Sequence, residues 1–172
     1  MGFSNTDIGA IVKGSGLVMQ IIGGFIGGFW MLKVGINRGL WVFGVVQLVT
    51  ILGFAWLANA GPFEVVGVTE RWMLAMVIGG EALGVGLGTV AYVAYMARET
   101  NPAYTATQLA LFTSLSAVPR SIFNAMTGGM VESLGWEHFF YVCTLLAIPG
   151  MLLLFKVAPW NAKGSDLQKA ET

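Results

Sequence analysis

The chain has 172 residues, of which 56% are hydrophobic and 10% are charged, and its mean hydropathy is +0.74. Soluble domains carry about 25% charged residues, so this composition is typical of a membrane-embedded protein. The formal net charge is zero, and nothing in the charge balance indicates nucleic-acid binding. A single cysteine and a single histidine exclude a disulfide framework and a zinc-type cluster, and we expect no cofactor.

Five hydrophobic segments are long enough to cross a bilayer as helices. They run from about 7 to 32, 40 to 58, 72 to 97, 107 to 131 and 137 to 157. The connections are short and carry turn residues such as Gly35 and Gly135, so we predict antiparallel neighbours in one all-α membrane bundle, residues 1–160. Residues 161–172 are polar and are expected to form a disordered cytoplasmic tail.

Two patterns support these spans and orient them. All six tryptophans lie at predicted segment ends, where the aromatic belt of a membrane protein is expected: Trp30, Trp41, Trp56, Trp72, Trp136 and Trp160. One side collects the basic residues Lys33, Arg38, Arg98, Lys156, Lys163 and Lys169. The opposite side has only Arg71 in a loop. Because basic loops stay in the cytoplasm, we predict an outside N-terminus and a cytoplasmic C-terminus.

The first segment opens with Ser4 and Asp7 at capping-box spacing. It carries two polar residues, Lys13 and Gln20, on one face. Lys13 lies about two turns below the outer end and can snorkel to the surface, whereas Gln20 lies deeper. Glycines at four-residue spacing in the first and third segments predict close contacts between helices, as in Gly23-x-x-x-Gly27, Gly24-x-x-x-Gly28 and Gly80-x-x-x-Gly84-x-x-x-Gly88.

The fourth segment carries Arg120 almost at its midpoint. Polar residues recur around it at helical spacing: Thr113, Ser116, Arg120, Asn124 and Thr127. A charge at mid-depth costs roughly 3 kcal/mol on insertion scales, so it normally faces a partner or a watery cavity. We read this stripe as one wall of a polar pathway. The alternative is a structural arginine tied to a neighbouring helix.

Glu81, near the middle of the third segment, is expected within about 5 Å of the depth of Arg120. Two readings stay open. The residues form a structural ion pair, or Glu81 titrates during turnover while Arg120 attracts an anionic cargo group. Tyr92 lies on roughly the same face as Glu81 and offers a hydrogen-bonding partner. Alternatively, Tyr92 belongs to the belt of aromatic residues at the membrane interface.

Two further features bear on the fourth segment. Thr105 and Gln108 have capping-box spacing, which by itself explains both residues. Pro119 removes a backbone donor beside Arg120, so a kink is expected there.

Four stretches resemble the AmpG-type muropeptide permeases of the major facilitator superfamily. They are Gly2-Phe3-Ser4 with Ile8-Gly9, the run from Gly35 to Gln47, the run from Glu81 to Thr89, and the run from Thr105 to Leu111 with Ser114-Leu115 and Arg120. Together they extend from Gly2 to Phe155. The resemblance matches Glu81, Gln108 and Arg120 to functional positions of the family. It differs at Leu32, where the superfamily has an aspartate, and in the placement of Pro119.

The resemblance implies the last five helices of a transporter in the bacterial inner membrane. It implies proton-driven import of anhydro-muropeptides for cell-wall recycling, with the lipid bilayer, the solute, the proton and the missing N-terminal helices as partners. We expect the site at Glu81, Arg120, Asn124, Gln108, Gln20, Lys13 and Tyr92.

Two alternatives stay open. One is a related carrier of another anionic solute, such as a siderophore or acetyl-coenzyme A. The other is a small structural subunit whose polar stripe binds a partner protein. An enzyme is not expected, because no His or Cys cluster and no nucleophile–base pair occurs in the sequence.

Overall fold

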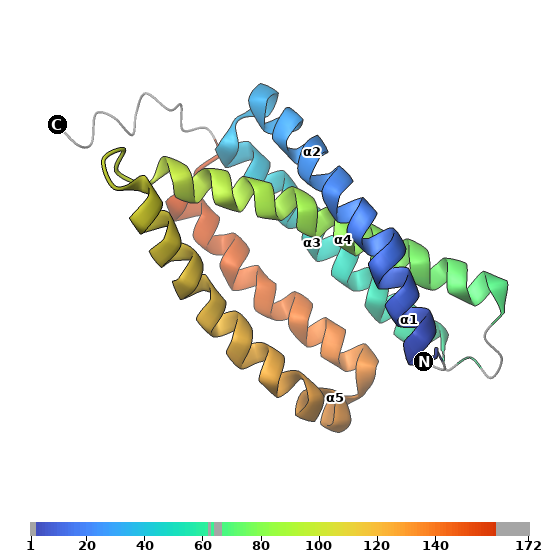
Figure 1. Ribbon diagram of the computed structural model, residues 1–172. Helices are drawn as coiled ribbons and strands as arrows, with labels where there is room; N and C mark the ends of the chain where they lie inside the picture. The colour runs from blue at the N-terminus through green and yellow to red at the C-terminus, as the bar shows by residue number, and fades with distance from the viewer. Residues whose placement is uncertain (1–2, 62, 64–66, 161–172) are drawn as a thin grey trace.

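The computed structural model describes residues 3–61, 63 and 67–160. All regular structure in this part of the chain is helical, which confirms the predicted all-α bundle (Figure 1). The elements in order are α1 (Asn5–Ile11), the π-helical segment η1 (Val12–Gly16), α2 (Leu17–Val34), α3 (Ile36–Ala60), α4 (Val68–Arg98) and α5 (Thr105–Val157). The predicted tail, residues 161–172, lies outside the described residues.

Four helical spans within the described residues are long and apolar enough to cross a membrane: Asn5–Val34, Ile36–Ala60, Val68–Arg98 and Thr105–Val157. The last is α5, with 53 residues, and it unites the predicted fourth and fifth helices. Its only non-helical backbone is at Gly135. From there two arms, residues 105–134 and 136–157, run in opposite directions (Figure 1). We call the first the Arg120 arm. The predicted loop between 131 and 137 was therefore too long.

Two glycines make the tight turns between antiparallel helices. Gly35 has φ 87° and ψ 160°, and Gly135 has φ 76° and ψ 165°. Residues with a Cβ are almost excluded from this region of backbone space, so only glycine allows such a short connection. Both turns lie where the sequence predicted them.

α2 packs along α4 through glycines that bring the two backbones together. A Cβ added at Gly23 would collide with the carbonyl oxygen of Leu83, and one at Gly86 would collide with that of Gln20. The sequence predicted close helix contacts at glycines in these two segments, and α2 and α4 make such a contact at Gly23 and Gly86. Gly28, from the same motifs, has open space around it, so only part of the glycine pattern lies at the contact.

α3 packs between α4 and the second arm of α5. Its buried side chains Phe43 and Leu57 are 1% and 0% exposed and belong to two core clusters shared with α4. Trp41 packs edge-on against Phe155 of α5. α5 itself contributes no buried residue. The Arg120 arm therefore lies at the margin of the packed core.

A hydrogen-bonded network closes the end of the bundle that carries Asn37, which we call the Asn37 end. Arg98 Nη1 donates to Asn37 Oδ1 at 2.6 Å, and Asn37 Nδ2 donates to the carbonyl of Pro159 at 3.1 Å. Trp41 Nε1 donates to the carbonyl of Ala158 at 3.0 Å. These bonds hold α3, α4 and the residues after α5 in fixed positions.

The opposite end, which we call the Asp7 end, holds the start of α1 and the start of α4. The predicted cap is present, because the Asp7 N–H donates to Ser4 Oγ at 3.1 Å. Asp7 also forms an ion pair with Arg71, with 3.3 Å between Oδ1 and Nε. This pair connects α1 to α4.

Candidate functional site

A cavity of about 770 Å³ lies at the Asp7 end. The segment from α1 to α2 forms one wall, α3 and α4 form the floor, and α5 forms the other wall. No residue of α1 or α2 packs against α5 in the described part of the chain, so the cavity stays open between these walls.

Four of the predicted site residues line this cavity: Lys13, Gln20, Glu81 and Arg120. They come from η1, α2, α4 and α5, and the fold brings them together from four separate stretches of sequence. Glu81 is half-buried, whereas the other three side chains are exposed to the open space. Polar groups gathered in an otherwise apolar bundle are typical of a solute or ion pathway.

Glu81 and Arg120 share the cavity without forming an ion pair. Within the described residues, the ion pairs are Arg71–Asp7 and Arg98–Glu99. The reading of Glu81 and Arg120 as a structural ion pair was therefore wrong for this conformation. Both charged groups instead line the same cavity, where a ligand can reach them.

Lys13 reaches the cavity from the π-helical segment Val12–Gly16. A π-helical turn takes an additional residue into the helix and changes the direction of the side chains that follow, and such turns are frequent at functional sites. The segment contains Gly14 and Gly16, and Ser15 Oγ donates to the Ile11 carbonyl at 3.0 Å. The sequence analysis noted that Lys13 could snorkel to the surface but included it in the expected site, and the structure places it on the cavity wall.

Three aromatic rings form another part of the lining: Phe54, Trp136 and Phe140. Phe54 and Phe140 stack with centroids 5.2 Å apart at 21°, and Trp136 and Phe140 stack at 6.1 Å and 26°. We call this set the aromatic stack. Sequence reasoning missed it because Trp136 was assigned to the interface belt. The run Gly135-Trp136 followed by Phe139-Phe140 was the available signal.

The remaining predicted site residues lie elsewhere. Gln108 Oε1 accepts a hydrogen bond from the Asn101 N–H at 2.7 Å, so it stabilises the loop before α5 rather than a capping box with Thr105. Tyr92 forms a 2.5 Å hydrogen bond with Ser116 Oγ, which connects α4 to the Arg120 arm. Asn124 is exposed on that arm. None of these three belongs to the cavity lining.

Pro119, where a kink was expected, lies inside the continuous helix of the Arg120 arm. The residues around Pro119 keep helical dihedral angles, and the break in α5 lies at Gly135. The turn at Gly135 and the Tyr92–Ser116 hydrogen bond both restrain the direction of the Arg120 arm.

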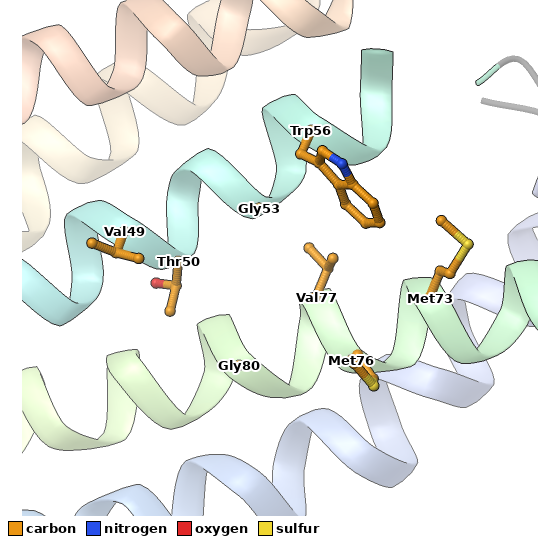
Figure 2. Close-up of a pocket in the computed structure, with 8 residues that line it drawn as sticks. All are labelled: Val49, Thr50, Gly53, Trp56, Met73, Met76, Val77 and Gly80. Atoms are coloured by element: carbon orange, nitrogen blue, oxygen red, sulfur yellow. The ribbon is translucent and has the colours of Figure 1, made fainter. Parts of the chain in front are cut away.

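A second, smaller hollow of about 330 Å³ lies between α3 and α4 (Figure 2). Its lining is almost entirely apolar: Val49, Thr50, Gly53, Trp56, Met73, Met76, Val77 and Gly80. Figure 2 shows Trp56 and Met73 extending into the space between the two helices. Among the residues that the structure describes, no titratable group lines this hollow, so it lacks the groups needed to bind a charged solute.

The described residues contain no group of three or more His, Cys, Asp and Glu side chains placed to hold a metal ion. The arrangement at the cavity is instead one carboxyl group, two cations and an aromatic wall. Such a site can bind an anionic solute and exchange a proton at the carboxyl group.

Sequence comparisons find relatives that match along nearly all of this chain. The chain is 57% identical over 159 residues to an uncharacterized protein of Haemophilus influenzae, covering 92% of this chain and 37% of the relative. It is 33% identical over 156 residues to the anhydromuropeptide permease of Escherichia coli K12, covering 90% of this chain and 30% of the permease. It is 33% identical over 154 residues to the putative transporter AmpG 4 of Rickettsia conorii, with 90% and 36% coverage.

No family model matches the chain. The chain spans about a third of the length of these relatives. The likeness to proteins named as a transporter and a permease extends over about nine-tenths of this chain. Together with the apolar helical spans, this likeness supports a multi-pass membrane protein that is similar in sequence to proteins named as transporters and permeases.

Proposed function

We propose that this chain is part of a proton-coupled transporter of the major facilitator superfamily that imports anhydromuropeptides across the bacterial inner membrane. The observation that supports it best is the open cavity with Lys13, Glu81 and Arg120, in a chain that is similar to an anhydromuropeptide permease. Five membrane crossings are proposed, with α5 counted as two and the Asn37 end in the cytoplasm.

The proposed mechanism assigns separate roles to the charged groups. A muropeptide combines amino sugars with a short acidic peptide. Arg120 and Lys13 bind the peptide carboxylates, and Glu81 carries the coupling proton. Cargo enters at the Asp7 end, where Phe3 and Asn5 belong to the cavity lining. The import of cell-wall fragments in this way serves cell-wall recycling.

A second part of the proposal concerns the Arg120 arm and the position of the remaining transporter helices. Secondary transporters bind their substrate between two repeated halves and move these halves against each other. The Arg120 arm has no buried residue and presents Leu111 and Leu115, which are 65% and 67% exposed. We propose that the other half of the transporter packs against this arm and completes the cavity.

A chimera tests the function. The matching segment of the E. coli anhydromuropeptide permease is replaced by this chain, and labelled anhydromuropeptide uptake is measured in cells that lack their own permease. We expect uptake that a protonophore abolishes. Proteoliposomes that contain this chain alone are expected to show no uptake, because the opposing half is absent.

Substitutions in the chimera test the assigned residues. Glu81→Gln and Arg120→Ala are each expected to lower uptake by about tenfold or more, because they remove charges that act on the proton and the cargo. Glu132→Gln is the matched control, since this exposed carboxyl group does not line the cavity. A membrane-inserted chimera without uptake would reject the function. Parental uptake by both variants would reject the site.

A further inference from the structure

The aromatic stack has a geometry that calls for an explanation beyond membrane anchoring. Phe54 of α3, Phe140 and Trp136 of α5 are nearly parallel, with angles of 21° and 26° between successive rings. All three line the same cavity as Glu81 and Arg120. A tryptophan that only anchors a helix at the bilayer interface needs neither ring partners nor a place on a cavity wall.

The backbone and one side-chain hydrogen bond fix the position of Trp136. Gly135, with φ 76°, reverses the chain immediately before it. Glu137, directly after it, accepts a hydrogen bond from Asn59 Nδ2 at 2.9 Å, which ties this turn to the end of α3. The backbone that carries Trp136 is thus restrained before any ligand binds, which lowers the entropic cost of binding. Trp136 remains 48% exposed, so part of its ring is free for contact.

The chemistry of the stack differs from that of the charged residues. The face of an aromatic ring carries partial negative charge, and it attracts groups with partial positive charge. The axial C–H groups of a pyranose ring are such groups, and their face is flat enough to lie on an indole. The cavity therefore offers aromatic faces in one place and the cations Lys13 and Arg120 in another.

We propose that the aromatic stack is a saccharide subsite, in which Trp136 packs against a pyranose ring of the cargo while Arg120 binds an acidic group of the same molecule. This inference rests on the proposed function, because a muropeptide carries both chemical groups. It adds residues that the charged site does not contain. It also separates recognition of the sugar from recognition of the peptide.

The test measures binding to the purified chimera, in which the cavity is complete, by saturation-transfer NMR in detergent micelles. The probes are the disaccharide of N-acetylglucosamine and 1,6-anhydro-N-acetylmuramic acid without peptide, and separately the free stem peptide. We expect saturation of the pyranose ring protons of the disaccharide. Trp136→Ala should reduce this signal by about fivefold, and Trp136→Phe should retain most of it.

Trp56→Ala is the matched control. Like Trp136, Trp56 is an exposed tryptophan, with 57% of its surface accessible. It lies near the end of α3 and faces the apolar hollow between α3 and α4 (Figure 2). Its removal should leave the disaccharide signal unchanged. Trp136→Ala should leave the peptide signal unchanged, whereas Arg120→Ala should reduce it. Circular dichroism of each variant verifies that the helices are retained.

The outcomes separate the saccharide subsite from the proposed transport function. A disaccharide signal that is absent, that survives Trp136→Ala, or that falls equally with Trp56→Ala would overturn the saccharide subsite. If the chimera still imports anhydromuropeptide in that case, the transport function stands. If the chimera fails to import but disaccharide binding depends on Trp136, the subsite stands and the transport function does not.

Discussion

The α2–α4 contact and the Arg120 arm of α5 are both built from apolar residues, but the first is tightly packed and the second is exposed. At the α2–α4 contact, glycines bring the two backbones so close that an added Cβ at Gly23 or Gly86 would meet a carbonyl oxygen. The Arg120 arm has no buried residue, and Leu111 and Leu115 are exposed. The first region holds the bundle together, and the second is free to accept other helices or lipid.

The two ends of the bundle differ in a related way. At the Asn37 end, Arg98 donates a hydrogen bond to Asn37, and Asn37 donates one to the chain beyond α5. In the cavity toward the Asp7 end, Glu81 and Arg120 form no ion pair with each other. Hydrogen bonds within the protein stabilise its structure, whereas polar groups that face a cavity can act on a ligand. Stability and the proposed function therefore reside in different regions.

The largest effect on stability is expected from Gly86→Ala. The new Cβ would overlap the carbonyl oxygen of Gln20, so α2 and α4 must move apart. Overpacking of this kind costs about 3 kcal/mol. Thermal unfolding of the detergent-solubilised chain measures this loss of stability. Gly28→Ala is the control, because nothing lies within 4 Å of the position that its new Cβ would take. Equal melting temperatures for the two variants would show that the contact does not hold the bundle.

Gly135→Ala should have the next largest effect. Its backbone dihedral angles of 76° and 165° are unfavourable for alanine, and such strain costs about 2 kcal/mol. Gly128→Ala, in the helical part of the Arg120 arm with open space around it, is the control. The same unfolding measurement applies. Because Gly135 also positions Trp136, disaccharide binding should weaken together with stability, and unchanged binding would argue against that positioning.

Arg98→Ala should destabilise the chain by about 1.5 kcal/mol, because it removes a hydrogen bond from a charged donor to the buried Asn37. Hydrogen exchange at the start of α3 measures the local effect, and faster exchange is expected there. Protection of α2 should not change. Faster exchange throughout the chain, or none at all, would contradict a local role for the Asn37 end.

The smallest effect on the isolated chain is expected from Leu115→Ala. Leu115 is 67% exposed on the Arg120 arm, and exposed substitutions change stability by about 0.5 kcal/mol or less. In the chimera the larger variant Leu115→Trp should instead lower the yield of folded transporter, since this face is proposed to pack against the other half. Size-exclusion chromatography compares the yield of folded transporter for the two Leu115 variants. A normal profile for Leu115→Trp would place lipid, rather than helices, against this face.

The sequence by itself determined the helical class, the approximate spans and the two tight turns. Long apolar runs and the restricted backbone freedom of residues other than glycine are local properties, so Gly35 and Gly135 marked the reversals without knowledge of the fold. The sequence also picked out Glu81 and Arg120, because a charge in an apolar run is visible in one dimension.

Only the tertiary structure decided which of these polar residues meet. Helical spacing placed Asn124 beside Arg120, yet Asn124 lies away from the cavity, and Gln108 is engaged by the loop before α5. Conversely, Phe54 stacks on Phe140 across a separation in sequence that no local pattern reveals. The reason is physical: spacing fixes the face of one helix, but the neighbours of that face depend on how the helices pack.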